Sequence, residues 1–255
     1  MNPMNLNGRV IIITGAAQGI GQGVARKAAA LGATLALVDL NGDGVRATAA
    51  ELGAAHSVHV GSVADPGFVQ QMVADVVARH GDVNGLFNNA GIIRTAMIHK
   101  MSLADWQAVI DVNLSGVFNC LQAVGRHMLE RCEAGDTAPR RIVNVSSIAG
   151  RRGTIGQINY GAAKAGVLGI TMSAAREWAR LGICVNSVCF GAVETPMTEV
   201  IRGPKFIERT MAGIPMARIA QPDEVATPCC FLLSDGASYI TGQHLSIDGG
   251  AHIGF

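Results

Sequence analysis

The chain has 255 residues, of which 49% are hydrophobic, and its 20 Lys and Arg nearly balance its 19 Asp and Glu. A chain of this length and composition can bury one large core, so we expect a single domain covering residues 1–255. A formal net charge of +1 creates no broad field that would gather nucleic acid or anionic lipid, and the expected partner is a small molecule.

Short apolar segments rich in β-branched residues alternate with longer segments of helical periodicity. The expected strands cover residues 10–14, 34–40, 56–60, 85–88, 141–145, 183–188 and 244–247. The expected helices cover residues 19–31, 43–53, 67–80, 102–131, 158–181 and 222–233. Because this alternation is typical of right-handed βαβ crossovers, it predicts an α/β fold: a doubly wound, seven-stranded parallel sheet (Rossmann fold) with helices on both faces.

Two segments interrupt this alternation. Residues 132–140 lack apolar periodicity and are expected to form an exposed loop. Residues 190–221 are rich in Gly, Pro, Thr and Met and form an insertion after the sixth expected strand. Ligands of open α/β sheets bind beyond the carboxyl ends of the strands, so this insertion is interpreted as a mobile substrate lid. An ordered surface loop is the alternative.

A glycine-rich turn connects the first expected strand to the first expected helix. Its sequence is T-G-A-A-Q-G-I-G over residues 14–21. Glycines let a backbone approach a pyrophosphate closely, while the helix N-terminus supplies N–H donors and positive potential. Any tight strand-to-helix turn can need glycines, but the position of this turn favours a dinucleotide site.

Asp39 ends the second expected strand. A carboxylate there can accept hydrogen bonds from both ribose hydroxyls of an adenosine, and it repels a 2′-phosphate. Gln18 adds no cation to the glycine-rich turn. These two residues predict NAD rather than NADP as the cofactor. The alternative is that Asp39 only starts the turn into Asn41 and Gly42.

Tyr160 and Lys164 are four residues apart near the start of an expected helix, so their side chains share one face. A tyrosine hydroxyl normally has a pKa of about 10, and a neighbouring ammonium stabilises the phenolate and lowers that pKa. Tyr160 would then exchange protons near neutral pH. A Tyr-x-x-x-Lys pair is frequent by chance, but this pair follows Ser146 and Ser147 at the sheet edge expected to hold the dinucleotide.

These motifs, together with N-N-A-G at residues 88–91, resemble the short-chain dehydrogenase/reductase family over nearly the whole chain. The resemblance implies hydride transfer between NAD(H) and a secondary alcohol or ketone, with no metal. It implies that Ser147 orients the substrate oxygen, that Tyr160 exchanges a proton with it, and that Lys164 holds the ribose hydroxyls beside the nicotinamide. Asn113 would interrupt its helix and support a water that links the lysine to solvent.

The resemblance also implies which residues contact the cofactor. They are Gly15, Gln18, Gly19, Ile20, Gly21, Asp39, Ser62, Val63, Asn89, Ala90, Gly91, Tyr160, Lys164, Val193 and Thr195. Ser62 stands where the family often has Asp, and it would make a weaker version of the same contact to the adenine amine.

Phe190 stands where family members usually carry Pro. It is interpreted as a side chain that stacks near the nicotinamide or forms a wall of the substrate pocket. Arg94 and Arg151 would pair with an acidic substrate, with exposed loop arginines as the alternative. The candidate substrate contacts are Arg94, Ser147, Arg151, Tyr160 and Phe190, and they do not define one substrate.

The six cysteines include no C-x-x-C pair and no His at zinc-ligand spacing, so buried free thiols are expected. No apolar segment approaches the roughly 20 residues that span a bilayer, and no secretory signal is present. We therefore expect no membrane association and a cytoplasmic location. The last expected strand resembles the family's interface strand, which implies a homotetramer, with a dimer as the second choice.

The leading interpretation is an NAD(H)-dependent oxidoreductase that interconverts a secondary alcohol and a ketone. A 3-oxoacyl-thioester reductase is the enzymatic alternative, because it would share every catalytic residue. A preference for NADPH would favour that alternative, and Asp39 argues against it. A catalytically silent NAD-binding regulator is the alternative from another class. Such proteins typically lose the tyrosine, lysine or serine, and all three are present here.

Overall fold

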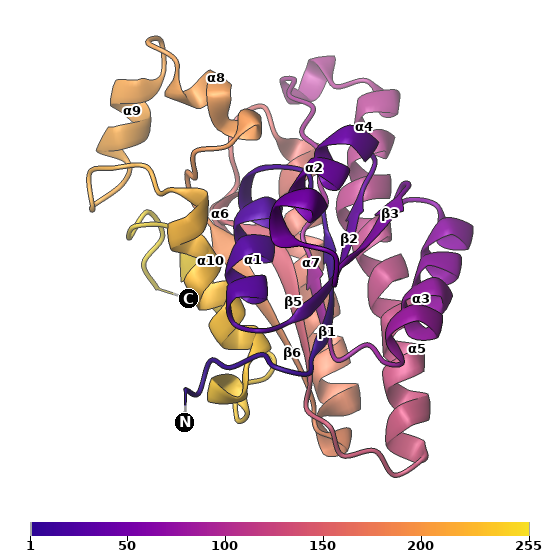
Figure 1. The fold of residues 1–255 in the computed structure, drawn as a ribbon. Coiled ribbons are helices and arrows are strands. Elements are labelled where there is room, and N and C mark those ends of the chain that lie inside the picture. Colours follow the sequence, from indigo (N-terminus) through magenta and orange to yellow (C-terminus); the bar gives the residue numbers. More distant parts are fainter. Residues whose placement is uncertain (1, 255) are drawn as a thin grey trace.

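The computed structural model describes residues 2–254. Seven parallel strands form one sheet in the order β3-β2-β1-β4-β5-β6-β7, which confirms the expected doubly wound α/β fold (Figure 1). The strands are β1 (Val10–Thr14), β2 (Thr34–Asp39), β3 (Ser57–Val60), β4 (Gly85–Asn88), β5 (Arg140–Ser147), β6 (Ile183–Phe190) and β7 (His244–Ile247).

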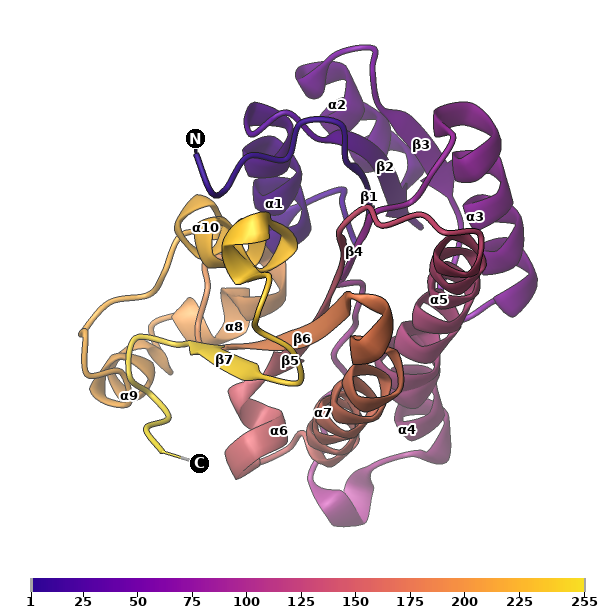
Figure 2. The same ribbon diagram turned by 90° about the horizontal axis from the view of Figure 1, so that it is seen from below.

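Helices cover both faces of this sheet. They are α1 (Gly19–Ala30), α2 (Gly42–Leu52), α3 (Pro66–His80), α4 (Leu103–Ile110), α5 (Gly116–Glu133), α6 (Ile148–Arg152), α7 (Ile158–Trp178), α8 (Glu199–Arg202), α9 (Ile207–Ala212) and α10 (Pro222–Leu233). Seen from below, α1 and α10 lie on one side of the sheet, and α3, α5 and α7 lie on the other (Figure 2).

The central strand β1 shows why the expected strands are continuously apolar. All five of its residues are buried. Ile11 and Ile13 belong to the core cluster that contains Val24 of α1, whereas Ile12 belongs to the cluster that contains Val124 of α5. Because successive side chains point to opposite faces of a strand, a strand covered on both faces favours apolar residues at successive positions, as at residues 10–13.

The helix expected over residues 102–131 is one continuous run in which a π-helical turn, Asp111–Ser115, separates α4 from α5. Contrary to expectation, this run is long and apolar enough to cross a membrane by length and composition, with a mean hydropathy of 1.2 in its most apolar window. Of that window, 44% is buried inside the fold. Val117, Val124 and Met128 are among the fully buried residues, so core packing explains the apolar character.

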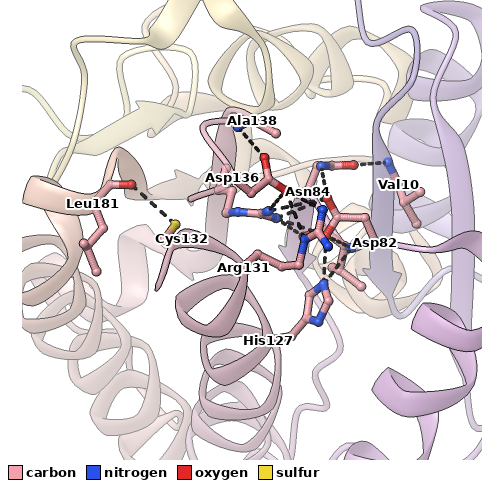
Figure 3. A network of polar contacts seen from close by, with 11 residues as sticks. Val10, Asp82, Asn84, His127, Arg131, Cys132, Asp136, Ala138 and Leu181 are labelled. Atoms are coloured by element: carbon pink, nitrogen blue, oxygen red, sulfur yellow. Dashed lines mark hydrogen bonds and ion pairs between the residues drawn. The ribbon is translucent and has the colours of Figure 1, made fainter. Parts of the chain in front are cut away.

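A network of ion pairs lies at the end of the sheet where the strands begin (Figure 3). Arg140, the first residue of β5, is 1% exposed and donates hydrogen bonds to Asp136 at 2.9 Å and to Asp82 at 3.2 Å. His127 of α5 lies 2.8 Å from the same Asp82 carboxylate. A buried guanidinium needs such partners, and these contacts fix the 132–140 loop far from the carboxyl ends of the strands.

The six cysteines are free, and all except the half-buried Cys132 are buried. They are Cys120, Cys132, Cys184, Cys189, Cys229 and Cys230. The expectation of buried free thiols is therefore confirmed for five of the six.

Ala217 is the one non-glycine residue within 2–254 that has a positive φ, at 52°. This left-handed conformation costs a residue with a Cβ roughly 1–2 kcal/mol, and glycine adopts it freely. We expect Ala217→Gly to raise the free energy of unfolding by up to about 1 kcal/mol, because the greater freedom of glycine in the unfolded chain offsets part of the gain.

Urea denaturation at pH 7 measures this change. Ala47→Gly is the matched control, since Ala47 is exposed in the interior of α2. There the same substitution should lower the free energy of unfolding by about 1 kcal/mol. A loss of stability in Ala217→Gly equal to that in the control would contradict the interpretation of strain.

Candidate functional site

A cavity of about 380 Å³ opens at the carboxyl ends of the strands. It extends from Asp39 at the end of β2 to Tyr160 in α7. Fourteen of the predicted cofactor contacts line it: Gly15, Gln18, Gly19, Ile20, Asp39, Ser62, Val63, Asn89, Ala90, Gly91, Tyr160, Lys164, Val193 and Thr195.

The glycine-rich turn has a backbone that only glycine fits. Gly15 and Gly19 have φ values of 69° and 58°. A Cβ on Gly15 would lie 2.7 Å from Nδ2 of Asn89, and a Cβ on Gly21 would lie 2.0 Å from the carbonyl oxygen of Gly15. Gly21 is therefore needed for the fold of the turn. It does not line the cavity, and its contact with the cofactor stays a prediction.

Thr14 links this turn to the turn after β4. Its Oγ1 accepts hydrogen bonds from the backbone N–H groups of Asn89 and Ala90, at 2.9 and 3.0 Å. Nδ2 of Asn89 donates back to the carbonyl of Thr14 at 3.0 Å. These bonds fix two cavity walls relative to each other. Thr14 belongs to the glycine-rich motif, and its linking role was not expected from the sequence.

The Asp39 carboxylate has two backbone partners. Oδ2 accepts from the N–H of Ala17 in the glycine-rich turn at 3.0 Å, and Oδ1 accepts from the N–H of Asn41 at 2.9 Å. Asp39 therefore starts the turn into Asn41, as the alternative interpretation required, and it also lines the cavity. Among the lining residues that the structure describes, Lys164 is the only Lys or Arg.

Ser147, Tyr160 and Lys164 converge at the other end of the cavity. Ser147 ends β5, and the other two residues lie in the first two turns of α7. Lys164 is 2% exposed, and its Nζ donates to the carbonyl of Val145 at 2.8 Å. The same Nζ lies 5.6 Å from the centre of the Tyr160 ring. The hydroxyls of Ser147 and Tyr160 and the ammonium of Lys164 thus lie at the same end of the cavity.

Burial controls the proton affinity of both groups in α7. It raises the pKa of Tyr160 to about 12, and a hydrogen bond with Ser147 opposes the rise. It lowers the pKa of Lys164 to about 8. The sequence led us to expect a lowered Tyr160 pKa, whereas in the structure the loss of hydration outweighs the hydrogen bond with Ser147 and the pKa is raised. Tyr160 is therefore protonated at neutral pH and equipped to donate a proton.

Asn113 lies in the π-helical turn and is fully buried. Its Oδ1 accepts from the N–H of Ile92 at 2.8 Å, and its Nδ2 donates to the carbonyl of Ile92 at 2.9 Å. Ile92 lines the cavity, whereas Asn113 does not. The structure therefore shows a helix interrupted at Asn113 and a side chain that fixes a cavity wall. Its link to Lys164 through water stays a prediction.

The predicted substrate contacts divide into two groups. Phe190 is 5% exposed and lines the cavity together with Ser147 and Tyr160. Arg94 and Arg151 do not line the cavity, and their contacts with a substrate stay predictions. The guanidinium of Arg151 donates to Oγ of Ser246 in β7 at 3.0 Å, and that of Arg94 donates to the neighbouring carbonyl of Ile93 at 3.0 Å.

The insertion after β6 is fixed at its base. The N–H of Glu194 donates to the carbonyl of Ala220 at 2.8 Å, so the two ends of the insertion pair with each other. A Cβ on Gly19 would lie 3.1 Å from Cγ2 of Thr195, which places this base against the glycine-rich turn. Figure 1 shows α8 and α9 projecting from this base, away from the sheet.

Eleven lining residues were not among the contacts expected from the sequence. They are Val38, Leu40, Gly61, Ile92, Val112, Val145, Ser146, Gly191, Pro196, Met197 and Thr198. Most are apolar or small and carry no chemical signal of their own. All of them lie within a few residues of a residue that the motifs identify, and this adjacency is the signal that would have found them.

Comparison with known proteins agrees with this geometry. The family model described as enoyl-(acyl carrier protein) reductase matches residues 15–252. The 3-oxoacyl-[acyl-carrier-protein] reductase FabG of Thermotoga maritima is 43% identical over 97% of this chain and 99% of the relative. The acetoacetyl-CoA reductase of Shinella zoogloeoides is 40% identical over 95% of this chain and 98% of the relative.

Solved structures share the fold over the same length. Levodione reductase has a TM-score of 0.90 at 35% identity, with 96% of this chain and 98% of that chain covered. A structure from Beutenbergia cavernae, described as an NAD(P)-dependent gluconate 5-dehydrogenase with NADP bound at low occupancy, has a TM-score of 0.91 at 34% identity, with 98% and 99% covered. The chain therefore belongs to the short-chain dehydrogenase/reductase family, whose oxidoreductases bind a nicotinamide cofactor.

Proposed function

We propose that this chain reduces a 3-oxoacyl thioester to the 3-hydroxyacyl thioester, with NADH as the hydride donor. One observation carries the proposal: a half-buried Tyr160, protonated at neutral pH, shares a cavity wall with Ser147 in a chain at least 40% identical to two 3-oxoacyl-thioester reductases over almost its full length. This proposal reverses the order of the two enzymatic interpretations drawn from the sequence.

The cavity suits a dinucleotide. The glycine-rich turn leaves no room for a Cβ at Gly15 or Gly21, and it leads into the N-terminus of α1, where free N–H groups favour a pyrophosphate. Asp39 would accept hydrogen bonds from the adenosine ribose, and Lys164 would bind the ribose of the nicotinamide half. A bound nicotinamide would supply the hydride.

The protein's own contribution is to polarise and protonate the substrate oxygen. Ser147 would donate a hydrogen bond to the carbonyl oxygen and hold it within reach of Tyr160. Tyr160 would transfer its hydroxyl proton to that oxygen as negative charge develops on it. In alcohol oxidation the tyrosinate form of Tyr160 would accept the proton of the substrate hydroxyl. The buried Lys164 ammonium would stabilise the tyrosinate that remains after reduction.

The test is absorbance at the reduced-nicotinamide band, with acetoacetyl-CoA as the substrate and NADH and NADPH supplied in parallel. Turnover with acetoacetyl-CoA supports the proposal. Turnover only with simple ketones would favour the broader secondary-alcohol reaction, which the likeness to levodione reductase supports. Tight NADH binding without turnover of any ketone or alcohol would favour the regulator.

The preference for NADH is proposed from Asp39 and from the absence of a second cation among the described lining residues. We expect Asp39→Asn to lower the ratio of kcat/KM with NADH to kcat/KM with NADPH by about 10- to 100-fold, because the variant loses the charge that repels a 2′-phosphate. An amide oxygen can still accept from the N–H of Ala17, so the turn should persist.

Asp43→Asn is the matched control, since the Asp43 side chain is 99% exposed in the first turn of α2. It removes the same charge four residues away and should leave the ratio within about twofold of the wild type. A ratio in Asp39→Asn equal to that of the control would remove the basis for proposing NADH.

A further inference from the structure

Asn159 precedes Tyr160 and is fully buried. Its Oδ1 accepts a hydrogen bond from the backbone N–H of Tyr160 at 2.8 Å. Its Nδ2 donates to the carbonyls of Arg94 and Asp105, each at 3.1 Å, and lies 3.4 Å from Sδ of Met101. One amide therefore satisfies a free N–H at the start of α7 and ties it to the segment between β4 and α4.

The segment held in this way begins at the cavity wall. Its first residue, Ile92, lines the cavity and forms two hydrogen bonds with Asn113. In its middle, the N–H of Ala96 donates to the carbonyl of Gly156 at 3.0 Å. Asn159 adds the contacts that reach both Arg94 and the first turn of α4, so it connects the backbone of Tyr160 to both ends of this segment.

We propose that Asn159 is a positioning residue for the reaction of Tyr160. It holds the 92–105 segment against the first turn of α7 and so sets the distance between the substrate carbonyl and the Tyr160 hydroxyl. Misplacement of reacting groups by about 1 Å can cost on the order of 10²-fold in rate. The inference rests on the proposed ketone reduction, since it assigns Asn159 a part in that step.

Asn159→Ser removes the amide that bridges the two segments. We expect kcat for the ketone to fall by about 10- to 100-fold. The dissociation constant for NADH should stay within about twofold of the wild type, because Asn159 does not line the cavity. The NADH constant, measured by fluorescence titration, separates a local loss of alignment from a collapsed site.

Asn159→Asp supplies a readout that a purely structural role would not move. An ionised carboxyl there would face the carbonyl oxygens of Arg94 and Asp105, and only its protonated form could donate to one of them. Burial and these oxygens raise the pKa of the introduced carboxyl. Above that pKa, we expect the kcat of the variant to fall about tenfold per pH unit, and at lower pH we expect it to recover. The kcat of the wild type should show no such fall over the same pH range.

Asn186 offers a matched control. It is 1% exposed in β6, its Nδ2 donates to the carbonyl of Ile240 at 2.7 Å, and its Oδ1 accepts from the N–H of Gln243 at 3.0 Å. Asn186→Ser and Asn186→Asp therefore break the same kinds of bond away from the cavity. They should lower the melting temperature and leave kcat and its pH profile unchanged. An equal fall of kcat in both Ser variants would overturn the proposal, as would wild-type kcat in Asn159→Ser.

Hydrogen–deuterium exchange keeps this test independent of the substrate. In Asn159→Ser the backbone N–H groups of Ala96 and Tyr160 should exchange faster than in the wild type. In Asn186→Ser their exchange should be unchanged. If the wild type reduces no ketone, the proposed function fails, and unchanged exchange in Asn159→Ser would overturn the positioning role separately. Faster exchange confined to these two groups would support that role.

Discussion

Tyr160→Phe is expected to lower kcat for ketone reduction by on the order of 10³-fold while the affinity for NADH stays within about twofold of the wild type. Phenylalanine keeps the ring that lines the cavity and removes only the hydroxyl. Burial raises the pKa of that hydroxyl to about 12, so it carries its proton at every physiological pH. The loss in rate therefore measures the contribution of Tyr160 as a proton donor.

The chain provides its own control for this substitution. Tyr239 is the second of two tyrosines and is fully exposed. Tyr239→Phe should leave kcat and NADH binding unchanged. If Tyr160→Phe kept more than a tenth of the wild-type rate, the proton would have to come from Ser147 or from solvent. If it also lost NADH binding, the substitution would have damaged the cavity, and the rate would not report on proton transfer.

The order and type of the regular elements could be predicted because a strand covered on both faces is mostly apolar on both. That preference leaves an uninterrupted apolar segment such as residues 10–13, and glycines mark where β1 turns into α1. The same turns place the motif residues at one sheet edge. The positions of Gly15, Asp39, Ser147, Tyr160 and Lys164 on the cavity wall therefore follow from sequence order alone.

Strand ends and side-chain partners could not be predicted in this way. The fifth and sixth strands extend two residues beyond the expected ends because Ser146 pairs with Cys189 and Ser147 with Phe190, so each strand prolongs the other. Arg151 has the charge of a substrate contact, yet it lies where β7 offers Ser246 as a partner. Both outcomes depend on contacts between segments about 40 to 95 residues apart, which local pattern does not contain.

The burial of Lys164 could not be predicted from the sequence either, and it is expected to affect the stability of the fold. Burial lowers the pKa of Lys164 from its usual 10.5 to about 8. One pKa unit corresponds to about 1.4 kcal/mol, so keeping this ammonium charged in the fold costs roughly 3 kcal/mol. Its hydrogen bond to the carbonyl of Val145 returns part of that cost.

Lys164→Met is therefore expected to raise the free energy of unfolding at pH 7 by about 1 kcal/mol, even though the carbonyl of Val145 loses its partner at a cost of about 1–3 kcal/mol. Ketone reduction should fall by on the order of 10²-fold or more, since the tyrosinate left by proton transfer loses its ammonium. Urea denaturation and the absorbance assay measure the two effects.

The sign of the pH dependence separates this explanation from simple repacking. Below pH 8, Lys164 is protonated in both the folded and the unfolded wild type, and the full cost is present. Between pH 8 and 10.5 the unfolded state keeps a proton that the folded state has released, so wild-type stability rises with pH. The advantage of Lys164→Met should therefore be largest at pH 7 and smaller at pH 9.5.

Lys205→Met, at an exposed lysine after α8, should show no gain that depends on pH in this way. A Lys164→Met variant less stable than the wild type by the same amount at pH 7 and pH 9.5 would contradict the cost assigned to the buried charge. A gain at pH 7 that shrinks at pH 9.5, together with lost turnover, would mean that Lys164 opposes folding and that its place beside Tyr160 serves the reaction.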